Sequence, residues 1–433
     1  MSVETGFAGA AVLLVLLILR VPVALALITV SFGGIALLIG IGPALGVVAN
    51  TPYSFTASWT LSAVPMFLLM GFVSYHAQLT TGLFDAAKTL LRRLPGALAI
   101  ASVFACSGFA AVCGSSLATA ASMGRIAIPE MIRAGYAPSI ATGAIAAGGT
   151  IGALIPPSIL MIVYGVFAET SITRVFLGGI SIGIITAISY SIVILLLAWL
   201  RPDVVPRRPI TEETLTARQA LGRTWPVLLL ILIVFGGLFS GFFTATEAGA
   251  VGAIGAILCA AMVGKLNTEV MRRALLETLM TSASLFIIGI GAAMFTRFLG
   301  ITGLSGFIAG QVSGAELGYW HLMLIIVLVY IVLGMFMEPF GAMLITLPVF
   351  LPILSAEQIS LVWFGVLVVK LLEIGMITPP VGLNVFVIRN VAQKYATVVQ
   401  IYRGVTPFLL ADIVVVVLVL AWPGLVLMLP NLM

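Results

Sequence analysis

Two short stretches of this sequence combine glycines, paired prolines and hydroxyl residues inside apolar runs. They read GGTIGALIPPSIL at 148–160 and EIGMITPPVGLNV at 373–385. Proline removes a backbone donor and clashes with the preceding turn, so two adjacent prolines unwind a helix locally. The freed carbonyls suit a small cation, and the half-helix that follows presents bare N–H groups to an anion. Each break therefore predicts a site that can hold a cation and assist an anion.

Two other stretches place polar residues at expected reversals of the chain. VCGSSLATAASMG at 112–124 offers serine hydroxyls after a glycine, and MEPFGAMLITLP at 337–348 offers a carboxylate before one. If each tip meets a break at mid-membrane, two similar sites form, and Na⁺ fits their carbonyl and hydroxyl oxygens. The first predicted site comprises Ser115, Ser116, Gly149, Gly152, Ile155 and Pro156. The second comprises Glu338, Gly341, Met343, Ile374, Gly375 and Thr378.

Six residues on the same segments are candidates for contact with an anionic substrate. They are Thr119, Arg125, Pro157, Ser158, Pro380 and Asn384. Plainer explanations exist, because a GSS run alone is more often a packing seam and a lone Pro-Pro pair is more often a kink. Arg125 can pair within the protein, and Lys370 can neutralise Glu373 at i, i+3 spacing. Proton coupling through Glu338 or Glu373 is the alternative to sodium.

The composition places the chain in a membrane. Of 433 residues, 61% are hydrophobic and 8% are charged, whereas soluble domains carry roughly 25% charged residues. The net charge of +5 therefore informs membrane topology and does not indicate a nucleic-acid partner. The N-terminal MSVETGF lacks the basic region of a cleaved signal peptide, so residues 6–19 are predicted to be a retained helix.

Ten stretches are predicted to cross the bilayer, since about 20 apolar residues span its core. They are 6–19, 22–42, 60–78, 136–168, 174–200, 225–243, 246–264, 282–299, 358–389 and 405–428. Two punctuated apolar segments, 96–134 and 318–355, are predicted to be re-entrant helical hairpins. We also expect an uncharged external loop at 43–59 and an interfacial helix at 266–280.

The distribution of basic residues supports this topology. Lysine and arginine collect in cytoplasmic loops, and an external N-terminus puts sixteen of the 20 inside. They are Arg20, Lys88, Arg92, Arg93, Arg133, Arg201, Arg207, Arg208, Arg218, Arg223, Lys265, Arg272, Arg273, Arg389, Lys394 and Arg403. A hairpin that crossed fully would invert the pattern after it. Both termini are therefore predicted to be periplasmic.

The two halves of the chain repeat one another at a shift of 223 residues. The shift aligns Pro129 with Pro352, Pro156–Pro157 with Pro379–Pro380, and Gly152 with Gly375. Each half holds five crossings and a hairpin, and the odd number makes the second half inverted, as in secondary transporters. The predicted organisation is a first repeat at 1–200 (broken helix 136–168), a linker at 201–224 and a second repeat at 225–433 (broken helix 358–389).

Four motifs resemble the large (M, DctM-like) membrane subunit of tripartite ATP-independent periplasmic (TRAP) transporters. They are GSSLATAASMGRIAIPEMIRAGY, AAGGTIGALIPPSILMIVYGVFAETSI, GMFMEPFGAMLITLPVFLPI and LLEIGMITPPVGLNVFVI. The resemblance runs from about residue 60 to 410 and keeps the order of the motifs. It implies sodium sites at the Ser115–Ser116 tip with the 149–156 break and at the 338–343 tip with the 374–378 break.

The resemblance also implies a function and partners. It implies sodium-coupled symport of an organic acid, such as a C4-dicarboxylate or sugar acid, by an elevator movement of the hairpin-bearing domain. It implies a small four-helix membrane subunit, a periplasmic substrate-binding protein and a place among the lipids of the bacterial inner membrane. An enzyme is not expected, because Ser115 and Ser116 have no nearby histidine and no G-x-S-x-G or H-E-x-x-H motif occurs. A channel is not expected, because no carbonyl filter or charged ring is evident.

Overall fold

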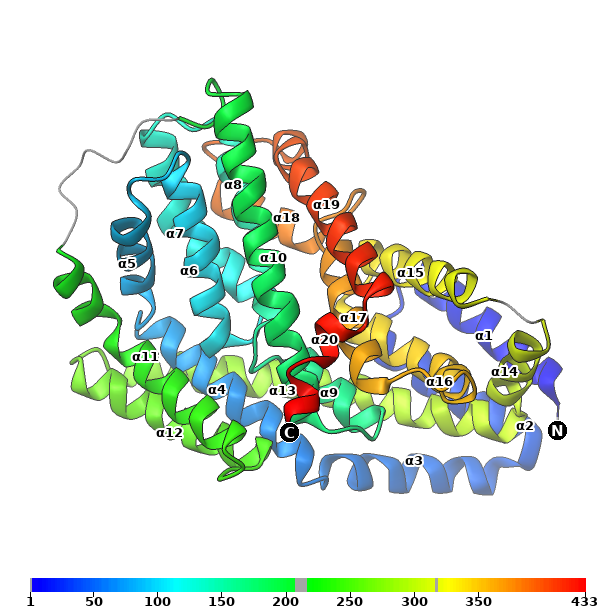
Figure 1. The fold of residues 1–433 in the computed structure, drawn as a ribbon. Coiled ribbons are helices and arrows are strands. Elements are labelled where there is room, and N and C mark those ends of the chain that lie inside the picture. The colour runs from blue at the N-terminus through cyan, green and yellow to red at the C-terminus, as the bar shows by residue number, and fades with distance from the viewer. Residues whose placement is uncertain (1, 207–215, 316–317) are drawn as a thin grey trace.

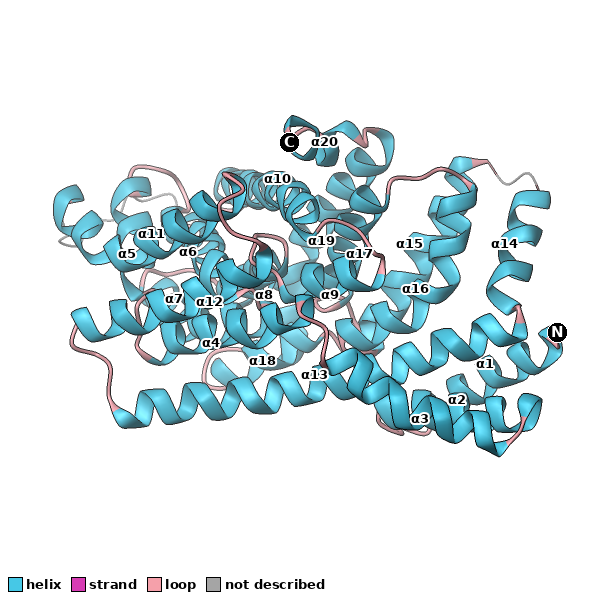
Figure 2. Cartoon of the chain, turned by 90° about the horizontal axis from the view of Figure 1, so that it is seen from below, coloured by secondary structure: helices cyan, strands magenta, loops and turns pink. Residues whose placement is uncertain are grey.

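The structure is a computed structural model that describes residues 2–206, 216–315 and 318–433. Within these ranges every regular element is a helix and no strand is present (Figures 1 and 2). This confirms the expectation of an all-helical polytopic membrane protein. Arg207 and Arg208, which we assigned to the cytoplasmic side, lie outside the described residues.

The helices follow the chain in four groups. The first is α1 (Val3–Ile18), α2 (Val23–Ile39), α3 (Ile41–Thr56), η1 (Thr60–Ser62), α4 (Ala63–His76) and α5 (Thr81–Leu91). The second is α6 (Ala97–Cys113), α7 (Ser116–Arg133), α8 (Pro138–Thr150), η2 (Ile151–Ala153), α9 (Ile159–Phe167) and α10 (Ile172–Leu200). The third is α11 (Ala217–Phe239), α12 (Ala245–Met262), α13 (Thr268–Thr302) and α14 (Leu304–Gly314). The fourth is α15 (Tyr319–Phe336), α16 (Pro339–Ala356), α17 (Leu361–Gly375), α18 (Leu383–Val391), α19 (Val398–Ala421), α20 (Gly424–Leu427) and η3 (Pro430–Leu432).

Seven helices in the described residues are long and apolar enough to cross a membrane, or eight if α3 and η1–α4, which meet at a 60° bend, form one span. The seven are α10, α11, α12, α13, α15, α16 and α19. Both arms of the second hairpin meet this criterion, although we expected them to be re-entrant. Helices α1 and α2 are slightly shorter, at 16 and 17 residues. The ten predicted crossings therefore include helices shorter than 18 residues, such as α1 and α2, and the two interrupted helices.

Two local expectations are wrong. Segment 43–59 is mostly helical, because Gly40 (φ +98°) turns the chain between α2 and a second apolar run that forms α3. Segment 266–280 is not a separate interfacial helix, since it is the first part of α13, which has 35 residues. No proline interrupts α13, so the helix continues into the predicted span.

Two helical hairpins and two interrupted helices lie at the predicted places. Helices α6 and α7 reverse at 114–115, and α15 and α16 reverse at 337–338. The first interrupted helix stops after η2 and resumes at α9, leaving residues 154–158 outside a helix. The second leaves residues 376–382 unwound between α17 and α18, and the proline–proline bond in each break is cis.

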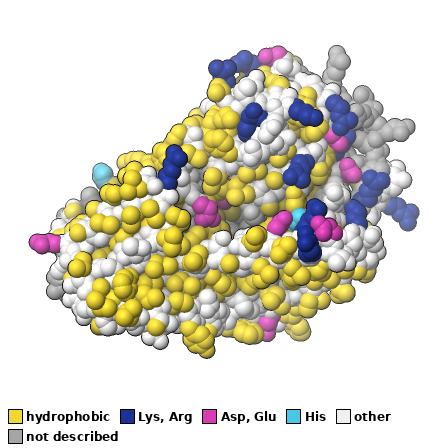
Figure 3. All heavy atoms as spheres, turned by 180° about the vertical axis from the view of Figure 1, so that it is seen from behind, with side chains coloured by type: hydrophobic (Ala, Val, Ile, Leu, Met, Phe, Trp, Pro, Cys, Tyr) yellow, Lys and Arg dark blue, Asp and Glu magenta, His cyan; other side chains and the backbone are white. Residues whose placement is uncertain are grey.

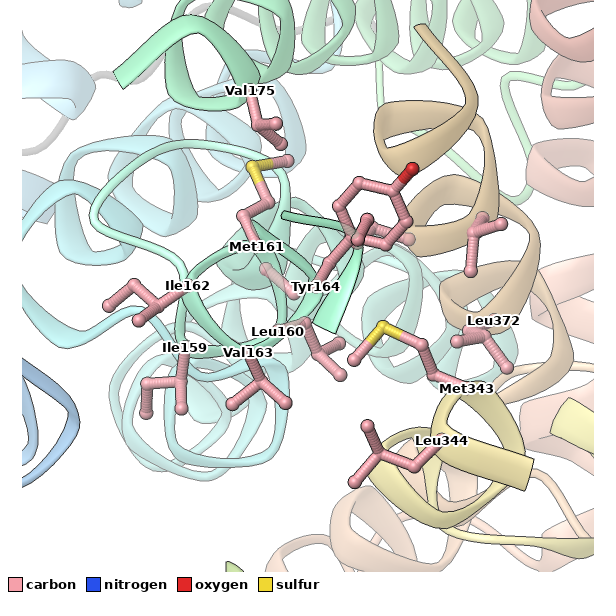
Figure 4. Packing of buried hydrophobic residues seen from close by; sticks show 14 of the residues in the cluster. Ile159, Leu160, Met161, Ile162, Val163, Tyr164, Val175, Met343, Leu344 and Leu372 are labelled. Carbon is pink, nitrogen blue, oxygen red and sulfur yellow. The ribbon is translucent and has the colours of Figure 1, made fainter. Parts of the chain in front are cut away.

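The helices bury two apolar clusters. One cluster joins α6, α7 and α8 to α10, α18 and α19, with Phe109 and Phe408 at its centre. The larger cluster includes α4, α9, α13, α16 and α17. Figure 4 shows Leu160 of α9 directed toward Met343 of α16, so the half-helix after the first break packs against the second hairpin. Helix α13 runs along the base of Figure 1 and packs against α2, α3, α4 and α16.

A network of hydrogen bonds around a buried ion pair joins helices from both halves of the chain. Lys370 Nζ lies 2.5 Å from Asp412 Oδ1, and the two side chains are 1% and 0% exposed. Tyr190 donates its hydroxyl to Asp412 Oδ2 at 2.8 Å and lies 3.4 Å from Thr150 Oγ1. Lys370 also donates to Thr186 Oγ1 at 3.2 Å. This network holds the end of α8, just before the first break, to α10, α17 and α19.

The ion pair differs from the one we expected for Lys370. Its acidic partner is Asp412, 42 residues away in the sequence, and not Glu373 at i+3. The hydroxyl of Ser116 donates to Glu373 instead. Charged side chains inside a membrane protein take the partner that tertiary packing presents, and helical spacing alone does not select it.

Removing one member of the buried pair is expected to destabilise the protein. Lys370→Met leaves the Asp412 carboxylate buried without its cation, which costs about 3–5 kcal/mol of the free energy of unfolding. The double variant Lys370→Met/Asp412→Leu should recover part of that loss, and Lys265→Met, at an exposed lysine, should change little. Thermal unfolding of the purified protein measures all three. Equal unfolding temperatures for Lys370→Met and the wild type would contradict a stabilising pair.

Candidate functional site

A cavity of about 950 Å³ lies where the hairpin tips and the breaks converge. Residues 113–118 of the first tip and 338–340 of the second line it, with Ile159 after the first break and Glu373 and Met376 beside the second. Helices α2, α4 and α13 contribute the rest of the wall. The structure therefore brings the four polar segments, which are far apart in the sequence, to one cavity.

The first tip fits closely against the first break. Ser115 caps α7, and its Oγ accepts a hydrogen bond from Ala118 N at 3.4 Å. Gly114 adopts φ +63°, and a Cβ at this position would lie 2.0 Å from the carbonyl oxygen of Pro157. Only glycine combines this conformation with this approach. The glycine thus lets a freed carbonyl of the break reach the serine-bearing tip.

The remaining residues of the first predicted site lie on or next to this contact. Gly149 and Gly152 face the first turn of α7, where Ser116 backbone atoms are their neighbours. Ile155 and Pro156 lie in the break itself, and the Ile155 side chain packs against α10. All six residues of this set therefore come from the tip or the break that meets it.

Ser116 links the first tip to the second break. Its hydroxyl donates to Glu373 Oε1 at 3.1 Å and lies 3.6 Å from Met376 Sδ. Ser116 is 6% exposed and Glu373 is 0% exposed. Glu373 Oε2 is buried and makes no hydrogen bond in the structure. The carboxylate thus has one oxygen free to bind a proton or a cation.

The end of the helix before the second break makes a similarly close contact with an arm of the second hairpin. A Cβ on Gly375 would lie 2.5 Å from the carbonyl carbon of Gly334 on α15, so the break packs directly on a hairpin arm. Thr378 turns its hydroxyl back to the Ile374 carbonyl at 2.6 Å. Glu338 lines the cavity at the tip.

Gly341 and Met343 of the second predicted site lie outside the cavity lining. Gly341 faces the side chain of Val23 on α2. The Met343 side chain is buried in the larger apolar cluster, and its carbonyl accepts a hydrogen bond from Thr346 Oγ1 at 2.9 Å. Their contribution to a cation site would therefore come through the backbone near the tip.

The donor set at the cavity favours oxygen ligands of hydroxyl and carbonyl type. Within the described residues, no three His, Cys, Asp or Glu side chains gather as a metal cluster. A cation at the tips would therefore rely on serine hydroxyls and on carbonyls freed by the breaks, and the carboxylates of Glu338 and Glu373 line the same cavity. Such neutral donors suit a monovalent ion that must bind and leave.

None of the six predicted substrate contacts lines the cavity. Thr119 donates to Ser115 O at 2.7 Å, and Ser158 caps α9 by accepting from Met161 N at 3.4 Å. Arg125 lines a different cavity, and the Pro157 carbonyl faces Gly114. The Pro380 carbonyl accepts a hydrogen bond from the Tyr402 hydroxyl, and the buried amide of Asn384 makes no hydrogen bond. The structure therefore places these six around the tips and breaks and not on the open wall.

Helix α13 contributes polar residues to the cavity that were not among the predicted site residues. Glu277, Thr281 and Ser284 line it from this helix, and Glu277 Oε1 lies 3.1 Å from His76 Nε2 on α4. Their spacing of i, i+4 and i+7 puts three polar residues on one helical face. This spacing could have indicated a polar face of α13 directed toward a site. It was not used, because residues 266–280 were predicted to be a separate interfacial helix.

Residues 10–425 match the protein family described as tripartite ATP-independent periplasmic transporter, DctM component. The C4-dicarboxylate TRAP transporter large permease protein DctM of Pseudomonas aeruginosa is 37% identical over 377 residues, which cover 86% of each chain. The ectoine/5-hydroxyectoine TRAP transporter large permease protein UehC of Ruegeria pomeroyi is 31% identical over 425 residues, 97% of each chain. These relatives are transporter permeases.

A longer relative and a solved structure complete the comparison. The isethionate TRAP transporter permease protein DctMQ of Oleidesulfovibrio alaskensis is 31% identical, over 91% of this chain and 61% of its own length. The crystal structure of the Alcanivorax borkumensis YdaH transporter matches the fold with a TM-score of 0.63 at 16% identity, over 88% of this chain and 89% of that one. The match across nearly the whole chain and the identity to several large permeases lead to one conclusion: the chain belongs to the DctM component family of tripartite ATP-independent periplasmic transporters.

Proposed function

We propose that this large permease subunit carries an organic acid across the bacterial inner membrane by sodium-coupled symport. The observation that carries the proposal is the convergence of both hairpin tips and both broken helices on one cavity of about 950 Å³. Unwound backbone inside a membrane protein survives only where protein or a ligand satisfies it. A transport site is the function that this arrangement supports best.

Sodium is the proposed coupling ion because of the donors at the tips. The tip that carries Ser115 and Ser116 packs on the first break through Gly114, which approaches the Pro157 carbonyl, and the Ile374 carbonyl lies at the start of the second break. Proton coupling is the second candidate, and the unpartnered oxygen of Glu373 favours it. A carboxylic acid could carry a proton there, and Glu338 lines the same cavity.

The proposed substrate class is an organic acid of the size of a C4-dicarboxylate or sugar acid. The names of the relatives cover C4-dicarboxylate, isethionate and ectoine, so membership of the family leaves the individual substrate open. The half-helices α9 and α18 begin directly after the breaks, and their N-terminal N–H groups favour negative charge. An anion could therefore bind next to the cation sites.

The proposed partners are a small four-helix membrane subunit and a periplasmic substrate-binding protein. The family is tripartite by description, and the longer DctMQ relative extends well beyond the length of this chain. We propose an inverted repeat with both termini in the periplasm, and an elevator movement of the hairpins and breaks against α2, α4 and α13. Residues of both sets line the cavity, so such a movement would change its walls.

Sodium binding should raise the stability of the protein without any substrate. A ligand that binds only the folded state adds RT ln(1 + [L]/Kd), about 2.7 kcal/mol at a hundredfold excess over Kd. We expect the unfolding temperature to rise in NaCl and not in matched KCl or choline chloride. Identical unfolding temperatures in the three salts would contradict sodium sites.

Ser116→Ala should weaken the sodium response. Loss of one hydroxyl ligand costs about 1–1.5 kcal/mol, so the sodium concentration for half-maximal uptake in proteoliposomes should rise about tenfold. Ser107→Ala is the matched control, because Ser107 lies on the other arm of the same hairpin and bonds only to its own helix at Val103 O. Unchanged sodium dependence in Ser116→Ala would remove this residue from the site.

The carboxylates separate sodium coupling from proton coupling. We expect uptake in Glu338→Gln and Glu373→Gln to remain driven by sodium, at a higher sodium concentration for half-maximal uptake if the carboxylate binds the cation, and a proton gradient alone to drive no uptake in the wild type. Uptake by proteoliposomes under imposed sodium or proton gradients makes the distinction. Proton-driven uptake that disappears in Glu373→Gln would replace sodium with a proton as the coupling ion.

Gly375→Ala tests whether the second break needs its close contact. The added Cβ would lie 2.5 Å from the carbonyl carbon of Gly334, and overpacking of this kind costs about 1–3 kcal/mol. We expect uptake to fall about tenfold. Gly306→Ala is the control, because a Cβ there meets nothing within 4 Å. Wild-type uptake in Gly375→Ala would show that the break tolerates separation from α15.

A further inference from the structure

A second cavity, of about 340 Å³, lies between α7 and the turn that follows α18. Two cationic side chains, Arg125 from α7 and Lys394 from the turn, line it together. Asn390, Gln393 and Tyr395 add amide and phenol groups to the same wall. Every charged residue of the lining is therefore basic, and both cations are exposed.

Within the described residues, neither Arg125 nor Lys394 forms an ion pair with an acidic side chain. The only acid on α7 is Glu130, and its carboxylate is engaged by Lys88 at 2.9 Å. Between Glu373 and Asp412 the sequence has no Asp or Glu. The same interval contains Arg389, Lys394 and Arg403. The cavity therefore carries a local excess of positive charge that no acid in the described part of the chain neutralises.

The position of the cavity also brings it near apolar surface. Phe386 on α18 is 43% exposed and Tyr395 is 38% exposed. On the face shown in Figure 3, Lys and Arg gather toward the top and right, while the lower left is largely hydrophobic. A basic pocket between membrane helices at the positively charged end of the spans is typical of sites for lipid headgroups.

We propose that this cavity is a binding site for the phosphate group of an anionic ligand. Arginine presents a planar fork of donors that matches phosphate geometry, and lysine adds a compact charge. The amides of Asn390 and Gln393 can donate to the remaining oxygens. An anionic phospholipid headgroup and free phosphate share this chemistry, and the experiment separates the two sources.

A ligand in this cavity would connect two elements that belong to different halves of the chain. Arg125 lies on the return arm of the first hairpin, and Lys394 follows the half-helix after the second break. Helices α7 and α18 already pack against each other. A phosphate between the two cations would remove their mutual repulsion and strengthen that contact. This role is independent of which acid or ion the larger cavity takes.

The experiment uses the full-length protein purified in a neutral detergent. Native mass spectrometry measures the apparent affinity for phosphatidylglycerol and for phosphatidylcholine, and thermal unfolding measures the response to inorganic phosphate. The test variant is Arg125→Gln/Lys394→Gln, both at exposed positions. The control is Lys265→Gln, an exposed lysine between α12 and α13 that is outside the cavity.

We expect the wild type to bind phosphatidylglycerol more tightly than phosphatidylcholine. The double variant should bind phosphatidylglycerol about 30-fold more weakly, which corresponds to about 1 kcal/mol for each removed cation, while Lys265→Gln should match the wild type. Stabilisation by inorganic phosphate that is lost in the double variant, without a lipid preference, would support the site and identify free phosphate as its ligand. Equal lipid and phosphate responses in the wild type and the double variant would overturn the proposal, as would an equal loss in Lys265→Gln.

Discussion

The structure depends on how the broken helices satisfy their backbone away from water. A carbonyl that loses its helical donor inside a membrane must be covered by protein or by a ligand. Here the hairpins provide the cover: Gly114 brings the first tip to the carbonyl of Pro157, and Gly334 brings an arm of the second hairpin to Gly375. Breaks and hairpins therefore require one another, which explains why the chain contains both elements twice.

The cavity follows from the same requirement. With each hairpin packed on a break, residues of both tips line a cavity whose wall also includes residues of α2, α4 and α13. Ser116 and Glu373 then join the first tip to the second break across 257 residues of sequence. The half-helix α9 packs on α16 in the same region (Figure 4). A displacement of one hairpin would therefore change contacts at both breaks.

A buried network of charged and hydroxyl groups connects helices next to the two breaks. Lys370, Asp412 and Tyr190 form one network whose far end reaches Thr150, three residues before η2 ends. An ion pair of this kind contributes little net stability relative to apolar packing, but its geometry is strict. Its place beside the breaks suggests a structural use: it fixes the ends of α8 and α17 relative to each other. Helices α7 and α18, which line the second cavity, also pack against each other in the same region.

The sequence by itself determined the helical membrane class, the two hairpins and the two breaks, because these depend on local chemistry: apolar length, glycine at a turn and proline without a donor. It did not determine the partners of buried polar groups. Lys370 pairs with Asp412 and not with Glu373. Glu277 of α13 lines the cavity, although the sequence around it had indicated an interfacial helix. Spacing along one helix cannot reveal which distant helix packs against it. Only the tertiary structure, through the packing of α13, α17 and α19, decided those contacts.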